Sequence, residues 1–282
     1  MSDLPFFRVE NRGEMEILHP EPIASSGWSE DQMRGMAVSG ALARATERVL
    51  SGVGIERVRP SRVTIDLFKP ALMIPTIIET KIVRRGRRLC LIDATCIQAG
   101  APVARSITLC LQGSGTPSGA VWSPDHDFAP PPPELKPESD DLRLYFSEET
   151  GWTITSAAPA SAVRRRSWHF GMPIVVGEIV TPFQMAVCVA DVTNVVCNWG
   201  AGGLQFINAD VTVALSRLPI ELQFGLSAID RSEADGISVG TAALFDRHGV
   251  FGTTTILGLA NSQRAVDPRT SARIAGQMDH AV

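Results

Sequence analysis

The sequence contains one pattern twice. VTIDLFKP at 63–70 is followed, after 29 further residues, by Gly100, and VTVALSRLP at 211–219 is followed, after 29 residues, by Gly249. The prolines that end the two segments, like the two glycines, are 149 positions apart. A repeat of this length is typical of a duplicated domain, because solenoid units have periods of about 20–50 residues. A duplication allows one half to keep a catalytic site while the other serves as scaffold.

Composition excludes several classes of protein. The 282 residues allow two domains of about 140 residues each, and a net charge of -4 gives no general attraction to nucleic acid. Five cysteines lie within apolar segments and five histidines are scattered, so we expect free thiols and neither a metal nor a cofactor. The sequence shows no signal peptide and no run of 18 apolar residues. We therefore expect a cytoplasmic protein without a membrane span.

The first half reads as one helix followed by a meander of strands. Residues 28–50 have a face of small residues and favour a long helix with Ser29 as its N-cap. Alternating apolar residues and glycine-containing turns then predict four strands, at 60–69, 76–85, 88–99 and 102–112. A helix followed by an antiparallel meander that curls around it is a hotdog fold.

The second half repeats this order after a linker. Residues 113–140 are rich in Gly, Ser and Pro, which is typical of an extended linker. The pattern predicts a helix near 183–198, and strands at 142–154, 162–170, 207–217, 221–230, 236–246 and 250–260. We therefore predict an α+β tandem (double) hotdog, each half an antiparallel sheet wrapped around a central helix. Its units are an N-terminal hotdog at 1–112, a linker at 113–140 and a C-terminal hotdog at 141–282, with the two sheets joined edge to edge.

Several motifs give the chain a resemblance to a known family. The first half carries RGMAVSGALARA, Lys69-Pro70, the basic turn RRGRR and QAGAPVA, and the second half carries Trp168, VADVTN and SRLP. In this order and spacing they resemble the type II, medium- and long-chain acyl-CoA thioesterases, which are double-hotdog enzymes of the thioesterase-like superfamily. The resemblance implies hydrolysis of an acyl thioester to acid and thiol. The substrate is then an acyl-CoA, or less favourably an acylated carrier protein.

The resemblance also implies a single site, lying mainly in the second half. In the family an aspartate on the second helix, with Thr and Gln side chains from nearby strands, binds and activates the water. Asp191 of VADVTN matches the aspartate, and the threonine maps near 208–210. The glutamine maps to Ile256 or Leu257, so the family glutamine is missing, with Thr253–Thr255 just before it.

The residues themselves favour the same carboxylate. Asp191 lies in an apolar segment, where burial would raise its basicity, although an exposed or helix-capping aspartate is the alternative. Asn194, three residues on, shares its helical face and could orient the water or face the partner helix. Asp210 and Thr255 are candidates to replace the missing glutamine, or ordinary strand residues. The predicted catalytic set is thus Asp191, Asn194, Asp210 and Thr255, with no counterpart in the first half, where Glu47 is expected to be solvated.

Other charged and nucleophilic residues leave alternatives open. Arginines cluster at 84–88 and 164–166, where they could meet phosphates of the substrate or lie in solvated turns. Cys188 and Cys197 are expected to be core residues rather than nucleophiles.

Two other functions are open from the sequence. The missing glutamine favours a non-catalytic acyl-thioester-binding or scaffold protein. Hydratase chemistry would need a catalytic histidine, and His169 has no acidic neighbour in sequence. A homodimer is expected, because a curved sheet leaves exposed edges or faces.

Overall fold

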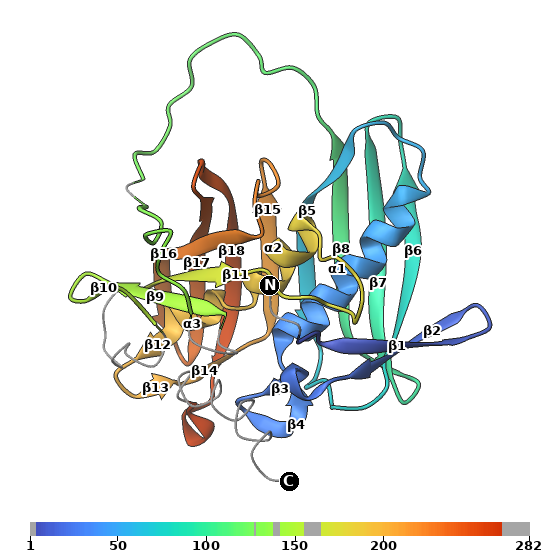
Figure 1. Cartoon of the computed structure of the whole chain (residues 1–282), viewed down its shortest axis with the longest axis horizontal. Coiled ribbons are helices and arrows are strands. Elements are labelled where there is room, and N and C mark those ends of the chain that lie inside the picture. Colours follow the sequence, from blue (N-terminus) through green and yellow to red (C-terminus); the bar gives the residue numbers. More distant parts are fainter. Residues whose placement is uncertain (1–3, 127, 138–141, 155–164, 267–282) are drawn as a thin grey trace.

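The computed structural model describes residues 4–126, 128–137, 142–154 and 165–266 (Figure 1). The first half contains one long helix and a meander of long strands; its elements are β1 (Phe7–Arg12), β2 (Met15–Pro20), the 3-10 helix η1 (Pro22–Ala24), β3 (Ser25–Ser26), β4 (Ser29–Met33), α1 (Gly35–Ser51), β5 (Val58–Leu67), β6 (Ile77–Arg85), β7 (Leu89–Gln98) and β8 (Ala101–Gln112).

The second half has the same general order. Its elements are β9 (Arg143–Ser147), β10 (Gly151–Ile154), β11 (Arg166–Phe170), α2 (Pro182–Ala190), α3 (Thr193–Asn198), β12 (Trp199–Gly200), β13 (Gly203–Leu204), β14 (Phe206–Asn208), β15 (Asp210–Leu215), β16 (Gln223–Ala234), β17 (Ile237–Asp246), β18 (Gly249–Ala260) and the 3-10 helix η3 (Ser262–Arg264). No helix among the described residues is long and apolar enough to cross a membrane.

One antiparallel sheet runs through both halves and confirms the predicted double hotdog. Its strand order is β10-β9-β11-β16-β17-β18-β15-β5-β8-β7-β6, with β14 added beside β18. The two repeated segments meet at its centre, where β5 and β15 pair antiparallel with Thr64 opposite Thr212. The two repeated sequence segments therefore form the strand pair that joins the two halves around an approximate two-fold axis.

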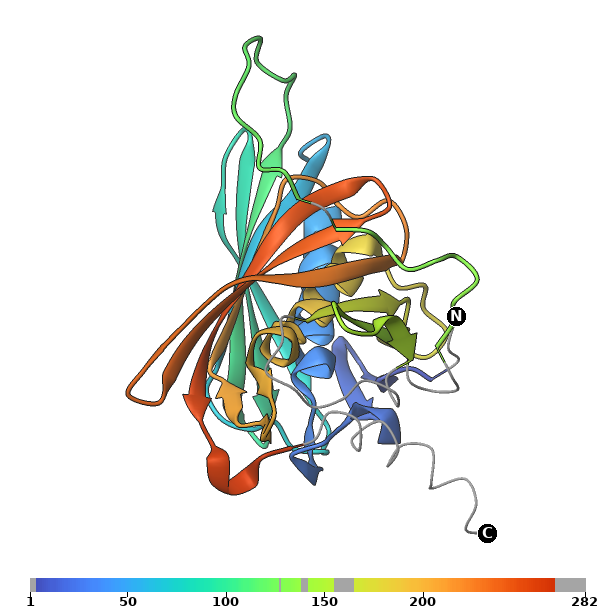
Figure 2. The same ribbon diagram turned by 90° about the vertical axis from the view of Figure 1, so that its left-hand side faces the viewer.

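The central helices of the two halves, α1 and α2, lie on the same side of the twisted sheet (Figure 2). The small residues of α1 allow close packing: a Cβ placed on Gly40 would lie 2.5 Å from Cδ1 of Ile174, which belongs to the segment before α2. Ala37 and Ala41 are buried on the same helix. The helix face predicted to be lined by small residues therefore contacts the other half of the chain.

The helix bounds differ from the sequence prediction. α1 begins at Gly35 rather than near Ser29, because residues 29–33 form β4 and are fixed by backbone bonds such as that from the Met33 N–H to the Ala71 carbonyl. Arg34 is the N-cap residue, and its side chain makes no capping hydrogen bond. The second helix, predicted as one segment, is divided into α2 and α3 at Asp191 and Val192.

The linker separates the two meanders. Residues 113–126 form an extended arch (Figure 1), after which Phe128 and Leu135 pack against Trp168 and Phe245 of the second half. The predicted strand at 162–170 is described only from residue 165, as β11; its earlier residues lie outside the described part of the chain.

Candidate active site

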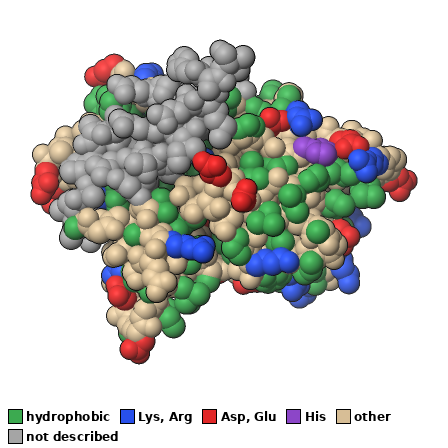
Figure 3. Space-filling view, turned by 90° about the horizontal axis from the view of Figure 1, so that it is seen from below, with side chains coloured by type: hydrophobic (Ala, Val, Ile, Leu, Met, Phe, Trp, Pro, Cys, Tyr) green, Lys and Arg blue, Asp and Glu red, His purple; other side chains and the backbone are tan. Residues whose placement is uncertain are grey.

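A cavity of about 320 Å³ lies between the two halves. The first half contributes the β3–β4 turn, the start of α1 and the end of β5; the second contributes the α2–α3 junction and β14. Its lining includes Ser26, Trp28, Met33, Arg34, Gly35, Met36, Leu67, Phe68, Lys69, Arg143, Asp191, Asn194, Ile207, Asn208 and Leu259. On the face shown in Figure 3, acidic and basic side chains are interspersed among apolar ones rather than gathered by sign.

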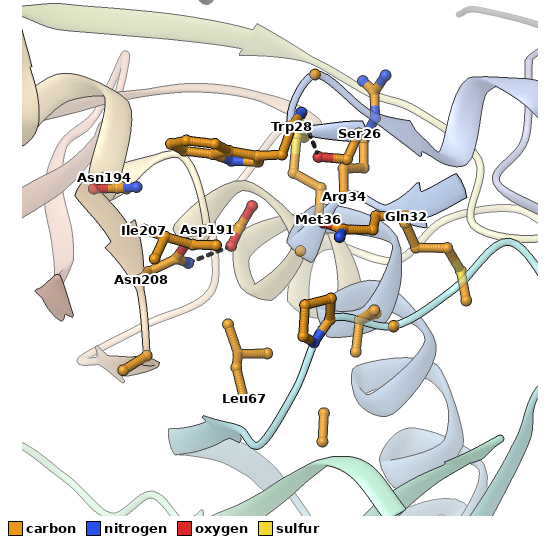
Figure 4. A pocket seen from close by; sticks show the side chains of 18 of the residues that line it. Ser26, Trp28, Gln32, Arg34, Met36, Leu67, Asp191, Asn194, Ile207 and Asn208 are labelled. Carbon is orange, nitrogen blue, oxygen red and sulfur yellow. Dashed lines mark hydrogen bonds between the residues drawn. The ribbon is translucent and has the colours of Figure 1, made fainter. Parts of the chain in front are cut away.

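The Asp191 carboxylate lies at the N-terminus of α1. The Met36 backbone N–H donates to it, and Asn208 Nδ2 donates to Asp191 Oδ1 over 2.6 Å (Figure 4). A Cβ on Gly35 would lie 2.6 Å from Asp191 Cγ and would clash with both carboxylate oxygens. Only glycine fits this first helical position, since the carboxylate of the other half occupies the space that a side chain would need.

The break between α2 and α3 presents Asp191 to the cavity. Thr193 Oγ1 donates to the Ala190 carbonyl over 2.6 Å and lies 3.1 Å from Thr254 Oγ1, whose hydroxyl can donate to it. The hydroxyl thus satisfies a carbonyl at the end of α2 and ties the junction to β18. Without such partners, a buried helix end would carry unsatisfied carbonyl groups.

Burial and hydrogen bonds act on Asp191 in opposite directions. Removal from water raises the pKa of this carboxyl above its ordinary value, while the Asn208 amide, the Met36 N–H and the Arg34 charge lower it. Desolvation is the largest effect, so the net pKa is raised. The partial positive charge at the N-terminus of α1 stabilises the ionised form. The result is a carboxylate that is more basic than one in water but still held in a fixed orientation.

Asn194, the second predicted residue, also lines the cavity. Its Nδ2 donates to the Phe206 carbonyl over 2.8 Å, and its Oδ1 accepts from Asn198 Nδ2 over 2.9 Å. These bonds tie α3 to the strand that carries Asn208.

The other two predicted residues lie elsewhere. The Asp210 carboxylate accepts from the Leu257 backbone N–H over 2.7 Å, and Thr255 Oγ1 lies 3.1 Å from Thr241 Oγ1. Because strand side chains alternate and Thr254 contacts α3, Thr255 points to the opposite face of the sheet. Neither residue lines the cavity. The structure therefore brings Asp191 and Asn194 together and separates Asp210 and Thr255 from them.

Two parts of the site were missed by sequence reasoning. Asn208 lies at one edge of the interval 208–210 to which the threonine was mapped, but it was not identified as the partner of Asp191. The start of α1 was missed because the helix was predicted to begin six residues earlier. The glycine of RGMA was the available signal, since a glycine that opens a helix marks a close approach.

The remaining sequence candidates take different places. The 84–88 turn lies between β6 and β7, at the end of the sheet away from this cavity. Arg165 is buried and stacks on Trp199 at 4.0 Å; the basic residues that line the cavity are instead Arg34, Lys69 and Arg143.

The buried thiols and His169 are poorly suited to nucleophilic or acid–base roles. Cys188 is buried, which raises its pKa, and burial raises the pKa of Cys197 to about 12. His169 is buried against Ser167 Oγ at 2.9 Å, and desolvation lowers its pKa. Within the described ranges no group of His, Cys, Asp or Glu is arranged to hold a metal ion.

One known protein family matches the first half of the chain. Residues 24–112 match the family described as acyl-CoA thioesterase N-terminal domain. A search of curated proteins found no match.

Solved structures resemble nearly the whole chain. The tesB protein of Mycobacterium avium subs paratuberculosis is 17% identical, with a TM-score of 0.64 over 89% of this chain and 95% of that one. Acyl-CoA thioesterase II TesB2 of Mycobacterium marinum is 14% identical, with a TM-score of 0.62 over 90% and 95%. A hot dog protein of unknown function from Alicyclobacillus acidocaldarius is 15% identical, with a TM-score of 0.58 over 89% and 95%. At these identities the likeness concerns the fold.

Proposed function

We propose that this chain, a double-hotdog protein of the thioesterase family, hydrolyses an acyl thioester with a water activated by Asp191. One observation carries the proposal: a desolvated carboxylate lines a cavity between the halves and is oriented by Asn208 and by the N-terminus of α1. The matched thioesterase domain and the structural likeness to an acyl-CoA thioesterase II support the same reaction.

The reaction needs a base, a water and stabilisation of negative charge. Asp191 takes a proton from the water as the water oxygen attacks the thioester carbonyl carbon. The tetrahedral intermediate then collapses and the C–S bond breaks, and the departing sulfur takes the proton from Asp191, so that free acid and thiol form and the carboxylate is regenerated. The chain needs no covalent nucleophile for these steps.

The start of α1 has the polarity that this chemistry requires. The first N–H groups of a helix have no partner within the helix, and together they favour negative charge. Arg34 does not cap them with its side chain, and the Met36 N–H donates instead to the Asp191 carboxylate. Negative charge on Asp191 or on the carbonyl oxygen is therefore stabilised at the same place.

The lining of the cavity favours an acyl group joined to a phosphorylated carrier. Trp28, Met33 and Leu67 provide apolar surface, while Lys69 and Arg143 provide positive charge. Acyl-CoA has both an apolar and an anionic part, and an acylated carrier protein presents a similar arm; we favour acyl-CoA as the substrate.

A panel of acyl-CoA thioesters of increasing chain length, assayed for release of free thiol, tests this proposal. We expect turnover that depends on chain length, because a cavity with an apolar lining discriminates by the apolar surface that it buries. Failure to release thiol from any acyl-CoA or acylated carrier would contradict it.

Binding without turnover is the second candidate. It is favoured by the two positions mapped to the family glutamine, since Ile256 and Leu257 are apolar and neither lines the cavity. Tight binding of an acyl-CoA without thiol release would establish this alternative.

A further inference from the structure

A second pocket lies at the other end of the helix pair. It encloses about 500 Å³ and is open to solvent, a size within the usual range for small-molecule sites. Its lining is Glu47, Leu50, Ser51, Gly54, Ile55, Glu56, Val58, Arg59, Pro60 and Leu218. The residues come from the end of α1, the start of β5 and the segment after β15.

This pocket is the internal symmetry counterpart of the Asp191 cavity. Arg59 and Pro60 correspond, at the offset of 148 positions that the strand register gives, to Ile207 and Asn208, which line the first cavity. Leu218 likewise lies 148 positions after Pro70, which lines the first cavity. The duplication that produced the central strand pair therefore produced two pockets.

The helix residues correspond as well. Asp191 contributes to its cavity with the residues three and four positions later, Asn194 and Val195. Glu47 contributes to the second pocket with the residues three and four positions later, Leu50 and Ser51. Each helix thus places one carboxylate beside the N-terminus of the other helix.

Glu47 is held in place rather than solvated, contrary to the sequence expectation. Its Oε2 accepts from Thr181 Oγ1 over 2.6 Å and from Gln184 Nε2 over 2.8 Å. Desolvation raises the pKa of this carboxyl. Among the described residues no hydrogen bond reaches Oε1, so this oxygen is available to a ligand that lies in the pocket.

The second pocket lacks the donors that hydrolysis would require. The start of α2 is capped by Thr181, whose hydroxyl accepts from the Gln184 N–H over 3.1 Å, and Pro182 at the first position has no N–H. By contrast, the N-cap residue of α1, Arg34, makes no side-chain cap, and the Met36 N–H of this helix donates to Asp191. A carbonyl oxygen in the second pocket would find fewer donors, so this geometry favours binding without turnover.

Two guanidinium groups, those of Arg59 and Arg85, lie at the second pocket. Arg59 lines it, and its Nη2 donates to the Ser216 carbonyl over 2.6 Å. Arg85 Nη2 lies 3.5 Å from the position that a Cβ on Gly54 would occupy. The basic 84–88 turn, which has no place in the first cavity, therefore lies at the rim of the second. Arginine suits phosphate because of its planar donors.

We propose that this second pocket binds a phosphopantetheine group and does not hydrolyse its thioester. The amide and hydroxyl groups of pantetheine would donate to Glu47, its methyl groups would contact Val58 and Leu218, and its phosphate would meet Arg59 and Arg85. The choice of ligand rests on the proposed function, because the two pockets are related by the duplication. Free CoA, the thiol product, and a phosphopantetheine carrier protein share this chemistry.

Calorimetric titration of the full chain with free CoA tests the inference. We expect two equivalents for the wild type and one for Leu218→Trp, which fills the second pocket. Lys69→Trp, in the lining of the first cavity, should remove the other equivalent. Arg85→Glu should weaken one of the two sites about tenfold by removing a charge-assisted hydrogen bond, whereas Arg62→Glu, exposed on β5, should weaken neither.

A parallel titration with a phosphopantetheine-bearing carrier protein distinguishes the two sources: a second equivalent seen only there identifies the carrier. The inference is overturned if neither probe binds beyond one equivalent, or if Leu218→Trp and Arg85→Glu both leave two equivalents unchanged. Either result leaves hydrolysis at the first cavity to be judged by thiol release, so the two proposals fail separately.

Discussion

At the scale of single residues, the position of Asp191 is fixed by neighbours from two segments, β14 and the start of α1. Asn208 orients one oxygen, the Met36 N–H contacts the carboxylate, and Gly35 leaves the space that it occupies. The Asn208 amide stabilises the ionised form more than the protonated form, because it donates a hydrogen bond to the carboxylate oxygen.

The pH dependence of turnover should reflect this hydrogen bond. A base must be unprotonated, so kcat/KM should rise with pH through the pKa of Asp191. Asn208→Leu removes the donor that lowers this pKa, so the acidic limb should move to higher pH. A pH–rate profile measured for both proteins on one acyl-CoA checks this; a limb that stays in place or moves to lower pH would contradict it.

Gly35→Ala should disturb the same group by crowding. The added methyl would overlap the carboxylate, which must move away from the α1 N-terminus. We expect kcat to fall at least about tenfold, since misplacement of a catalytic group by about 1 Å is costly. Steady-state kinetics checks this, with Gly113→Ala in the open linker as a control that meets no neighbouring atom; kcat within about twofold of wild type for Gly35→Ala would count against the prediction.

At the scale of elements, the contact between α1 and the segment before α2 joins the halves. Gly40 allows Ile174 to approach α1, and Arg44 bonds both Glu16 and Glu178 nearby. These contacts depend on Gly40, which has no side chain, and on the buried guanidinium group of Arg44.

Gly40→Leu should destabilise the fold by about 2 kcal/mol through overpacking. Ile174→Ala removes the side chain that the new leucine meets, so the double variant should lose less stability than the two single variants added together. Urea denaturation of the four proteins measures this; strict additivity would show that the two positions are not coupled.

The bounds of the elements show what sequence could and could not predict. The central strands were predictable, because VTID and VTVA alternate in polarity and lie between turn residues. The start of α1 was not, because the Met33 N–H of β4 bonds to the Ala71 carbonyl and the Arg34 N–H bonds to the Ala24 carbonyl, and local pattern does not contain these contacts. Asn208 was missed for the same reason: its contact with Asp191 depends on how β14 lies beside the helix break.

At the scale of the whole molecule, the outer face of the sheet carries a cluster of exposed apolar side chains. Val239 lies opposite Leu257 on neighbouring strands, and Ile237, Val239 and Leu257 are between 39% and 49% exposed. Their alternation with buried Ser238 and Gly258 places them on the face away from the helices. A contiguous apolar surface of this kind is typical of an association site.

We predict that the chain is a homodimer through this face. Light scattering should give twice the mass of one 30.3 kDa chain, and Leu257→Lys should shift it toward the monomer, because a charge cannot be buried there without a partner. A wild-type mass of one chain, or a dimer unaffected by Leu257→Lys, would contradict the prediction.

The central claim is that the Asp191 carboxylate activates water in the cavity between the halves. Asp191→Asn keeps the shape and removes the basicity, so the most direct test is its kcat on an acyl-CoA that the wild type hydrolyses. Asp66→Asn, exposed on β5 and outside the cavity, serves as the control. We predict a fall of at least about 10²-fold with little change in substrate affinity, and no such fall for the control. A kcat within about threefold of wild type for Asp191→Asn would contradict the claim.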